Sequence, residues 1–193
     1  MIVLIASLFV FLTQGIRPIS DDFATNYLEK SLKTVETSVQ SLGRNQYEFR
    51  PAEGRWSIKD NVEHLLKVEH TVQDLVFNFL KEKVRSDFKS DKTDDEIIKI
   101  ISVRQKNFNA PPQLQPKNEY KTLSEALLAY KEERQKTINL LQNTKTTLRQ
   151  ISGNNPVLGV IDGYQWFIFA SAHTERHMEQ INEIMNHQNF PKK

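Results

Sequence analysis

The 193-residue sequence contains no cysteine. This absence excludes disulfide bonds, a cysteine nucleophile and thiolate metal ligands. It does not identify the compartment, because exported proteins can also lack cysteine. An excess of one charge sign is also missing, since the formal net charge is only +2. No nucleic-acid-binding footprint is therefore expected.

The N-terminal apolar run Ile2–Leu12 is too short to cross a bilayer, which takes about 20 residues. It fits the hydrophobic region of a signal peptide, with Thr13 and Gly15 at −3 and −1 of a cleavage site. A basic segment before Ile2 is lacking, so an uncleaved anchor or an N-terminal strand are the alternatives. We expect residues 1–19 to hold the signal and the protein to be exported, with a cytoplasmic location as the alternative.

The remaining residues, 20–193, are expected to form one domain, because this length supports a single substantial core. Hydrophobic residues make up 38% and charged residues 26%, and eleven phenylalanines argue against disorder. Neither an internal repeat nor the alternation typical of strands is evident. The sequence is that of a helical protein.

Apolar residues recur at helical spacing in four long segments, each preceded by a residue that can cap a helix. The predicted helices are 20–42, 57–80, 122–143 and one starting at Asp162, with a shorter helix from Thr93 to about Phe108. A connector at 44–56, a proline-rich loop at 109–121 and a turn-rich link at 153–159 separate them. The pattern predicts an all-α four-helix bundle with one short extra helix in the crossover.

His173 and His177 are four residues apart, so their imidazoles lie on one face of the last helix. Such a pair is more often exposed or hydrogen-bonded than metal-binding. Here both members fall on an apolar stripe, where two unpartnered imidazoles would be costly, and this favours a metal site. His64 on the second long helix is the candidate third ligand, although alone it would be read as a histidine at the edge of the core. His70 and His187 are predicted not to take part.

Three neutral imidazoles leave the charge of a divalent ion uncompensated and leave coordination positions open. Such an ion can activate water or a substrate thiol. Asp60 could orient His64, although a helix cap is the preferred interpretation, and Gln180 could orient His177. Glu69 is a candidate general base, but a surface carboxylate is favoured. Trp166 and Tyr130 line either a pocket or the core.

Two segments resemble a known family. Residues 56–65, WSIKDNVEHL, are similar to the W-S-x-x-E/D-x-x-x-H-L segment of the DinB/YfiT-like superfamily. Residues 155–159 and 173–181 resemble its closing P-x-x-G and H-x-x-R-H-x-x-Q-I pattern, with Met178 where many relatives carry leucine. The resemblance spans roughly residues 20–187.

The resemblance implies an up-down-down-up four-helix bundle with a long crossover. It also implies a divalent ion, often nickel or zinc, held by His64, His173 and His177. Relatives include transferases that use low-molecular-weight thiols such as bacillithiol or mycothiol, and proteins described as hydrolases.

We therefore expect a metal-dependent enzyme with a small-molecule substrate, and a homodimer is considered as its assembly. Hydrolysis is favoured over thiol transfer if the chain is exported, because a cytosolic thiol would be scarce outside the cytoplasm. The alternative is a non-catalytic binding or stress-response bundle that holds a structural metal or none. An open coordination position distinguishes the two.

Overall fold

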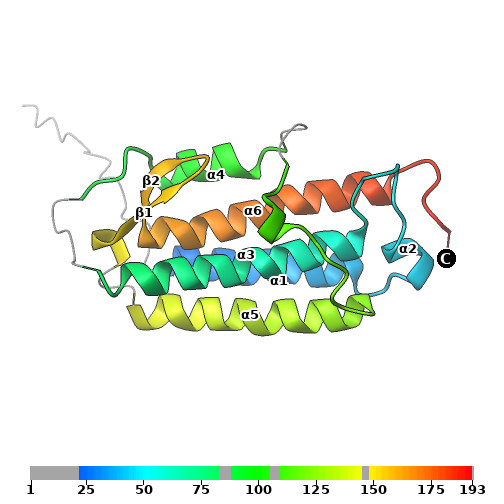
Figure 1. Ribbon diagram of the computed structural model, residues 1–193, viewed down its shortest axis with the longest axis horizontal. Helices are drawn as coiled ribbons and strands as arrows, with labels where there is room; N and C mark the ends of the chain where they lie inside the picture. Colours follow the sequence, from blue (N-terminus) through cyan, green and yellow to red (C-terminus); the bar gives the residue numbers. More distant parts are fainter. Residues whose placement is uncertain (1–21, 83–87, 105–108, 145–147, 193) are drawn as a thin grey trace, which may run out of the picture.

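The computed structural model describes residues 22–82, 88–104, 109–144 and 148–192. The predicted signal segment 1–19 and the predicted cap Ser20 lie outside these residues. Four long helices dominate the described chain (Figure 1): α1 Phe23–Val39, α3 Ile58–Phe79, α5 Leu123–Thr144 and α6 Gly163–Met185. Shorter elements connect them: α2 Arg44–Tyr47, α4 Asp94–Ser102, the 3₁₀ turns η1 Pro112–Leu114 and η2 Leu148–Gln150, and strands β1 Ser152–Asn155 and β2 Gly159–Asp162.

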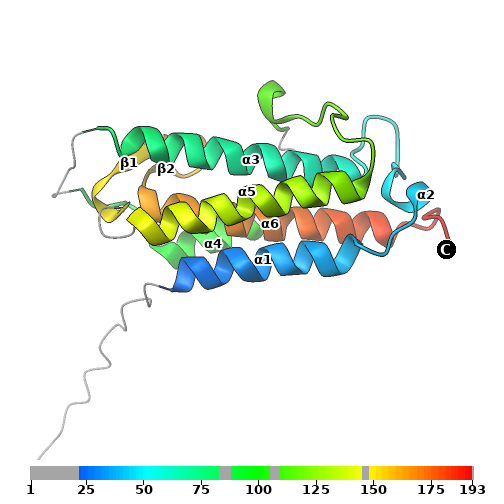
Figure 2. The same ribbon diagram turned by 90° about the horizontal axis from the view of Figure 1, so that it is seen from below.

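The four long helices form the bundle that the sequence predicts, in up-down-down-up order. Figures 1 and 2 show α1 and α6 running in one direction and α3 and α5 in the other. Because α3 and α5 are parallel, the chain must return along the bundle between them. This long crossover carries α4, which packs against α6, and η1, which lies against α3. Among the described residues, no helix is long and apolar enough to serve as a membrane span.

The predicted helix starts are confirmed where the capping residues are described. Ser57, Thr93 and Asp162 each accept a hydrogen bond from the backbone amide three residues on, completing a capping box. Thr122 accepts one from the Glu125 amide at 3.2 Å. Three bounds differ clearly from the prediction: α1 begins at Phe23 and ends at Val39 rather than at Leu42, and α4 ends at Ser102 rather than near Phe108.

The prediction of no strands was wrong, because β1 and β2 form an antiparallel hairpin with Ser152 opposite Asp162 and Asn155 opposite Gly159. Each strand has four residues, too few for alternation to show in the sequence. Gly153 lies so close to Phe79 that a Cβ there would be 1.9 Å from the ring. The hairpin is thus held against the C-terminal end of α3. Similarly, the expected connector 44–56 contains the short helix α2.

The core has two apolar clusters, one toward the hairpin end and one toward the α2 end, and a buried polar group between helices. In that group Arg134 Nη2 of α5 lies 2.6 Å from Glu69 Oε1 of α3, and both side chains are fully buried. Arg134 also donates to Tyr130 Oη and Thr174 Oγ1. The preferred interpretation of Glu69 as a surface carboxylate was therefore wrong.

Candidate metal centre

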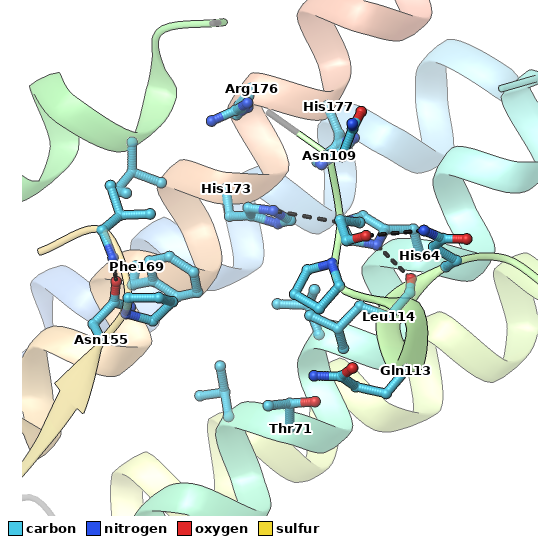
Figure 3. Close-up of a pocket in the computed structure, with 18 of the residues that line it drawn as sticks. His64, Thr71, Asn109, Gln113, Leu114, Asn155, Phe169, His173, Arg176 and His177 are labelled. Carbon is cyan, nitrogen blue, oxygen red and sulfur yellow. Dashed lines mark hydrogen bonds between the residues drawn. The ribbon is translucent and has the colours of Figure 1, made fainter. Parts of the chain in front are cut away.

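Three histidines from two antiparallel helices converge near the middle of α6 (Figure 3). One ring nitrogen from each of His64, His173 and His177 lies within 4.8 Å of the others. Figure 3 shows His64 and His173 pointing toward each other from α3 and α6. The predicted convergence is confirmed, since α3 brings its N-terminal turns alongside the second half of α6.

The orientation of His64 is set by the crossover. Its Nδ1 donates to the Leu114 carbonyl oxygen at 2.7 Å, so Nε2 carries the lone pair that faces the other two rings. Leu114 is the last residue of η1, and the loop that follows it is held by Glu63, the residue before His64 on α3. Buried Glu63 accepts hydrogen bonds from the amides of Lys117 at 2.6 Å and Glu119 at 3.2 Å. The loop therefore fixes both the ring position and the tautomer.

His177 is oriented by a side chain of the opposite helix. Its Nδ1 donates to Asn61 Oδ1 at 2.9 Å, and Asn61 Nδ2 donates to the Ser57 carbonyl oxygen at 2.8 Å. The second bond fixes which way the amide faces, so its oxygen is presented to the imidazole. Nε2 of His177 is left as the unprotonated nitrogen. Such an outer hydrogen bond is the usual way in which metal-binding histidines are positioned.

His173 forms the third corner of a triangle with the other two rings and is the most open of the three. Its Nε2 is 3.5 Å from His64 Nε2, and its buried Nδ1 has no hydrogen-bond partner among the described residues. Two nitrogens on one tetrahedral zinc-like ion, with bonds of about 2.0–2.1 Å, are about 3.4 Å apart. The spacing and donor chemistry therefore fit a shared divalent ion.

All three imidazoles are kept neutral. Burial lowers the pKa of His64 to about 4, against the raising effect of its bond to Leu114. Burial also lowers the pKa values of His173 and His177 well below the ordinary value, and the neighbouring imidazoles add to this effect. A neutral imidazole has the lone pair that a metal needs, so these rings are prepared for coordination near pH 7.

The histidines form one wall of a cavity of about 550 Å³ between α3, α6, the hairpin and the crossover. Trp56 covers the site, with its ring 4.8 Å from that of His64 and stacked at 6.0 Å on that of His177. Phe169 stacks on His173 at 5.5 Å on the opposite side. The aromatic rings limit water at the site while the cavity leaves room for a small molecule beside it.

Asp60 and Gln180, the two residues predicted to orient the ligands, do not make the hydrogen bonds that hold the imidazoles. Asp60 accepts bonds from the Ser57 amide and hydroxyl and pairs with Arg50 at 2.6 Å, so it caps α3. Leu114, not Asp60, holds the Nδ1 of His64. Gln180 lines the cavity, but His177 Nδ1 donates its hydrogen bond to Asn61 Oδ1.

Of the two predicted pocket residues, one lines the cavity and the other lies in the core. Trp166 lines the cavity, whereas Tyr130 is fully buried in the bundle and bonds to Thr174 and Arg134. Glu69, bound to Arg134 and Thr137, is also remote from the cavity lining. His70 stands half exposed and pairs with Glu133, away from the three ligands as predicted.

Sequence reasoning missed Asn61, the Leu114 carbonyl and the cavity position of Arg176. Asn61 stands three residues before His64, on the same face of α3, which is a signal that could have identified it. The carbonyl of Leu114 carries no side-chain signal. Arg176 was noted only as part of the resemblance, although its position three residues after His173 puts it on the face of α6 that carries that ligand.

Comparison with known proteins finds a family match and a relative by sequence. Residues 27–181 match the DinB superfamily. The uncharacterized protein YuaE from Bacillus subtilis (strain 168) is 23% identical over 146 residues, which cover 76% of this chain and 87% of YuaE.

A solved structure has a similar fold. YfiT from Bacillus subtilis, described as a probable metal-dependent hydrolase with an unusual four-helix bundle topology, matches with a TM-score of 0.56 and 13% identity. The match covers 92% of this chain and 93% of that chain. At this identity the likeness establishes the fold alone.

Proposed function

The chain belongs to the DinB superfamily, and we propose that it is a metal-dependent enzyme that acts on a small molecule, with hydrolysis as the favoured reaction. The observation that carries the proposal is the convergence of three neutral imidazole donors within 4.8 Å at the wall of a cavity. The description of YfiT as a probable metal-dependent hydrolase supports the same reaction class.

His64, His173 and His177 would hold the ion, and nickel or zinc suits imidazole donors. When bound, the ion would supply Lewis-acid activation of water or of a substrate carbonyl. Asn61 and the Leu114 carbonyl hold two of the rings in one tautomer, which limits reorganisation when substrate enters. Trp56 and Phe169 exclude bulk water from the three donors.

No carboxylate is found among the described cavity-lining residues. The two candidates from the sequence are committed elsewhere, because Asp60 caps α3 and Glu69 is paired with Arg134. A donor set with neither carboxylate nor thiolate leaves the positive charge of the ion undiminished, which suits activation of water at neutral pH.

Thiol transfer is the second candidate reaction, supported by the same donor set, because an uncompensated divalent ion also stabilises a thiolate. The predicted export of the chain favours hydrolysis, since low-molecular-weight thiols belong to the cytoplasm. A structural metal in a non-catalytic bundle is the remaining alternative. The cavity beside His173 argues against it, because structural sites are closed.

The test is an activity screen of nickel-loaded and zinc-loaded protein against small esters, amides and thiol-conjugation substrates. The proposal expects turnover that disappears with a chelator, returns on reloading, and is lost in His173→Ala. The matched control is His70→Ala, which removes a half-exposed histidine of α3 and should retain full activity. A chelator that lowers the melting temperature sharply, with no turnover on any substrate class, would favour a structural metal instead.

A further inference from the structure

The charged side chains that line the cavity, among the described residues, are all positive. Three arginines are found among its described lining residues, Arg55, Arg104 and Arg176, together with the three histidines, and none of these lining residues is aspartate, glutamate or lysine. A divalent ion on the histidines would add two further positive charges. Concentrated positive potential inside a partly enclosed cavity attracts and holds anions.

The three arginines are not equivalent. Arg104 Nε lies 2.8 Å from Glu183 Oε1, on the side of the cavity toward the C-terminal half of α6. Arg55 is exposed at the edge of the cavity. Arg176 is partly buried and lies within the ligand-bearing turn of α6, three residues after His173 and one before His177; Figure 3 shows it on the same helix as both histidines. Arg176 is therefore the cation best placed to meet a ligand beside the histidines.

Two buried donors at the hairpin side of the cavity also await an acceptor. Asn155 Nδ2 and Trp166 Nε1 have no hydrogen-bond partner among the described residues, and their side chains are only 1% and 3% exposed. The Asn155 oxygen already accepts from the amides of Val157 and Leu158, so its amino group has a fixed direction. A buried donor without an acceptor is unfavourable, because it has lost its hydrogen bonds to water and gained none in return. Both residues line the cavity, where an acceptor on a ligand could meet them.

We propose that the cavity binds a small organic anion, a carboxylate or a phosphate ester, whose negative group pairs with Arg176 and whose other end offers a hydrogen-bond acceptor to Asn155 and Trp166. Arginine suits this role because its planar fork binds such oxygens in pairs. The proposal rests on the proposed function for the identity of the site, and it names the substrate class.

The two tryptophans of the chain, Trp56 and Trp166, both line the cavity, so their fluorescence reports its occupancy. The experiment titrates metal-free protein with phenylacetate, phenyl phosphate and neutral phenylacetamide. We expect at least tenfold tighter binding of one or both anions than of the amide, and the stronger anion identifies the class. Arg176→Gln should remove that preference, Arg176→Lys should keep part of it, and Arg44→Gln, an exposed arginine of α2, should leave it unchanged.

Equal binding of the anions and the amide by wild type, or no saturation by any probe below about 10 mM, would overturn the proposal. So would an Arg176→Gln variant that is folded by circular dichroism and still prefers the anions. Should that variant fail to fold, the Arg176→Lys result and the loss of the preference at high salt decide the question. Because the protein is metal-free, failure here is distinct from failure of the proposed metal chemistry, which metal analysis measures separately.

Discussion

The side-chain oxygen of Asn61 accepts a hydrogen bond from His177 Nδ1 at 2.9 Å, across the contact between α3 and α6. Asn61 lies three residues before His64, so one short stretch of α3 supplies a ligand and also orients the ligand of the facing helix. The two helices are thereby coupled at the site itself. Displacing one of them would disturb two of the three donors.

We expect Asn61→Ala to weaken metal binding roughly 10–100-fold, the usual effect of removing an outer hydrogen bond to a ligand. The variant leaves His177 Nδ1 without its acceptor, so the ring can turn and change tautomer. Competition with a chromogenic chelator measures the dissociation constant. Asn61→Asp keeps an acceptor oxygen and should bind metal at least as tightly as wild type.

The matched control for this pair is Asn78→Ala, which removes an exposed asparagine near the C-terminal end of the same helix. Its metal affinity should equal that of wild type. An Asn61→Ala variant with unchanged affinity would show that the hydrogen bond to His177 is not needed to hold the donor in place.

The metal-free protein should lose stability as the pH falls from about 6.5 toward 4. Burial lowers the pKa of His64 to about 4 in the folded chain, whereas an unfolded histidine titrates near 6.5. The unfolded state then binds more protons in this window, and acid favours it. The contribution of His64 is full above pH 6.5 and falls by about 3 kcal/mol by pH 4. Urea denaturation across this range should show a smaller loss in His64→Gln, and equal losses would contradict the assignment.

We expect the buried pair of Glu69 and Arg134 to contribute to the free energy of unfolding and not to metal binding. Glu69→Gln leaves the Arg134 charge uncompensated in the bundle and should lower the free energy of unfolding by about 3–5 kcal/mol. Glu36→Gln, which breaks the more exposed pair with Lys131, should cost less than about 1 kcal/mol. Denaturant titration separates these outcomes. Loss of metal from a folded Glu69→Gln variant would instead tie this pair to the site.

The predicted export signal can be tested directly. Expression of the full chain in a bacterial host, followed by fractionation and N-terminal sequencing, should yield a mature protein that begins at Ile16. This follows from the small residues Thr13 and Gly15 at −3 and −1 of the cleavage site. An intact N-terminus in the cytoplasmic fraction would contradict export, and one in the membrane fraction would favour the anchor.

The helices and their starts could be predicted because their signals are local. Ser57 and Asp60 lie within one turn of each other, and their capping box needs no distant partner. The histidines could be grouped because His173 and His177 share a helix face, and because His64 on the second long helix was a candidate third ligand that the resemblance also implied. Once the four helices pack as a bundle, α3 lies against α6 and His64 reaches the other two histidines.

Interactions between helices explain what the sequence could not reveal. The burial of Glu69 depends on Arg134, which is 65 residues away and reaches it only because α3 and α5 run in parallel. The position of Leu114 depends on Glu63 holding a loop that has no helical pattern. Both contacts join residues that are far apart in the sequence and have no characteristic separation. Helical periodicity and capping patterns therefore cannot predict them.

The most direct test of the metal site is the metal content of protein purified after loading with nickel or zinc, for wild type, His173→Ala and His70→Ala. The site predicts close to one equivalent of metal per chain in wild type and in His70→Ala, and a loss of most of it in His173→Ala. Less than a tenth of an equivalent in wild type, or equal content in all three proteins, would contradict a shared ion on His64, His173 and His177.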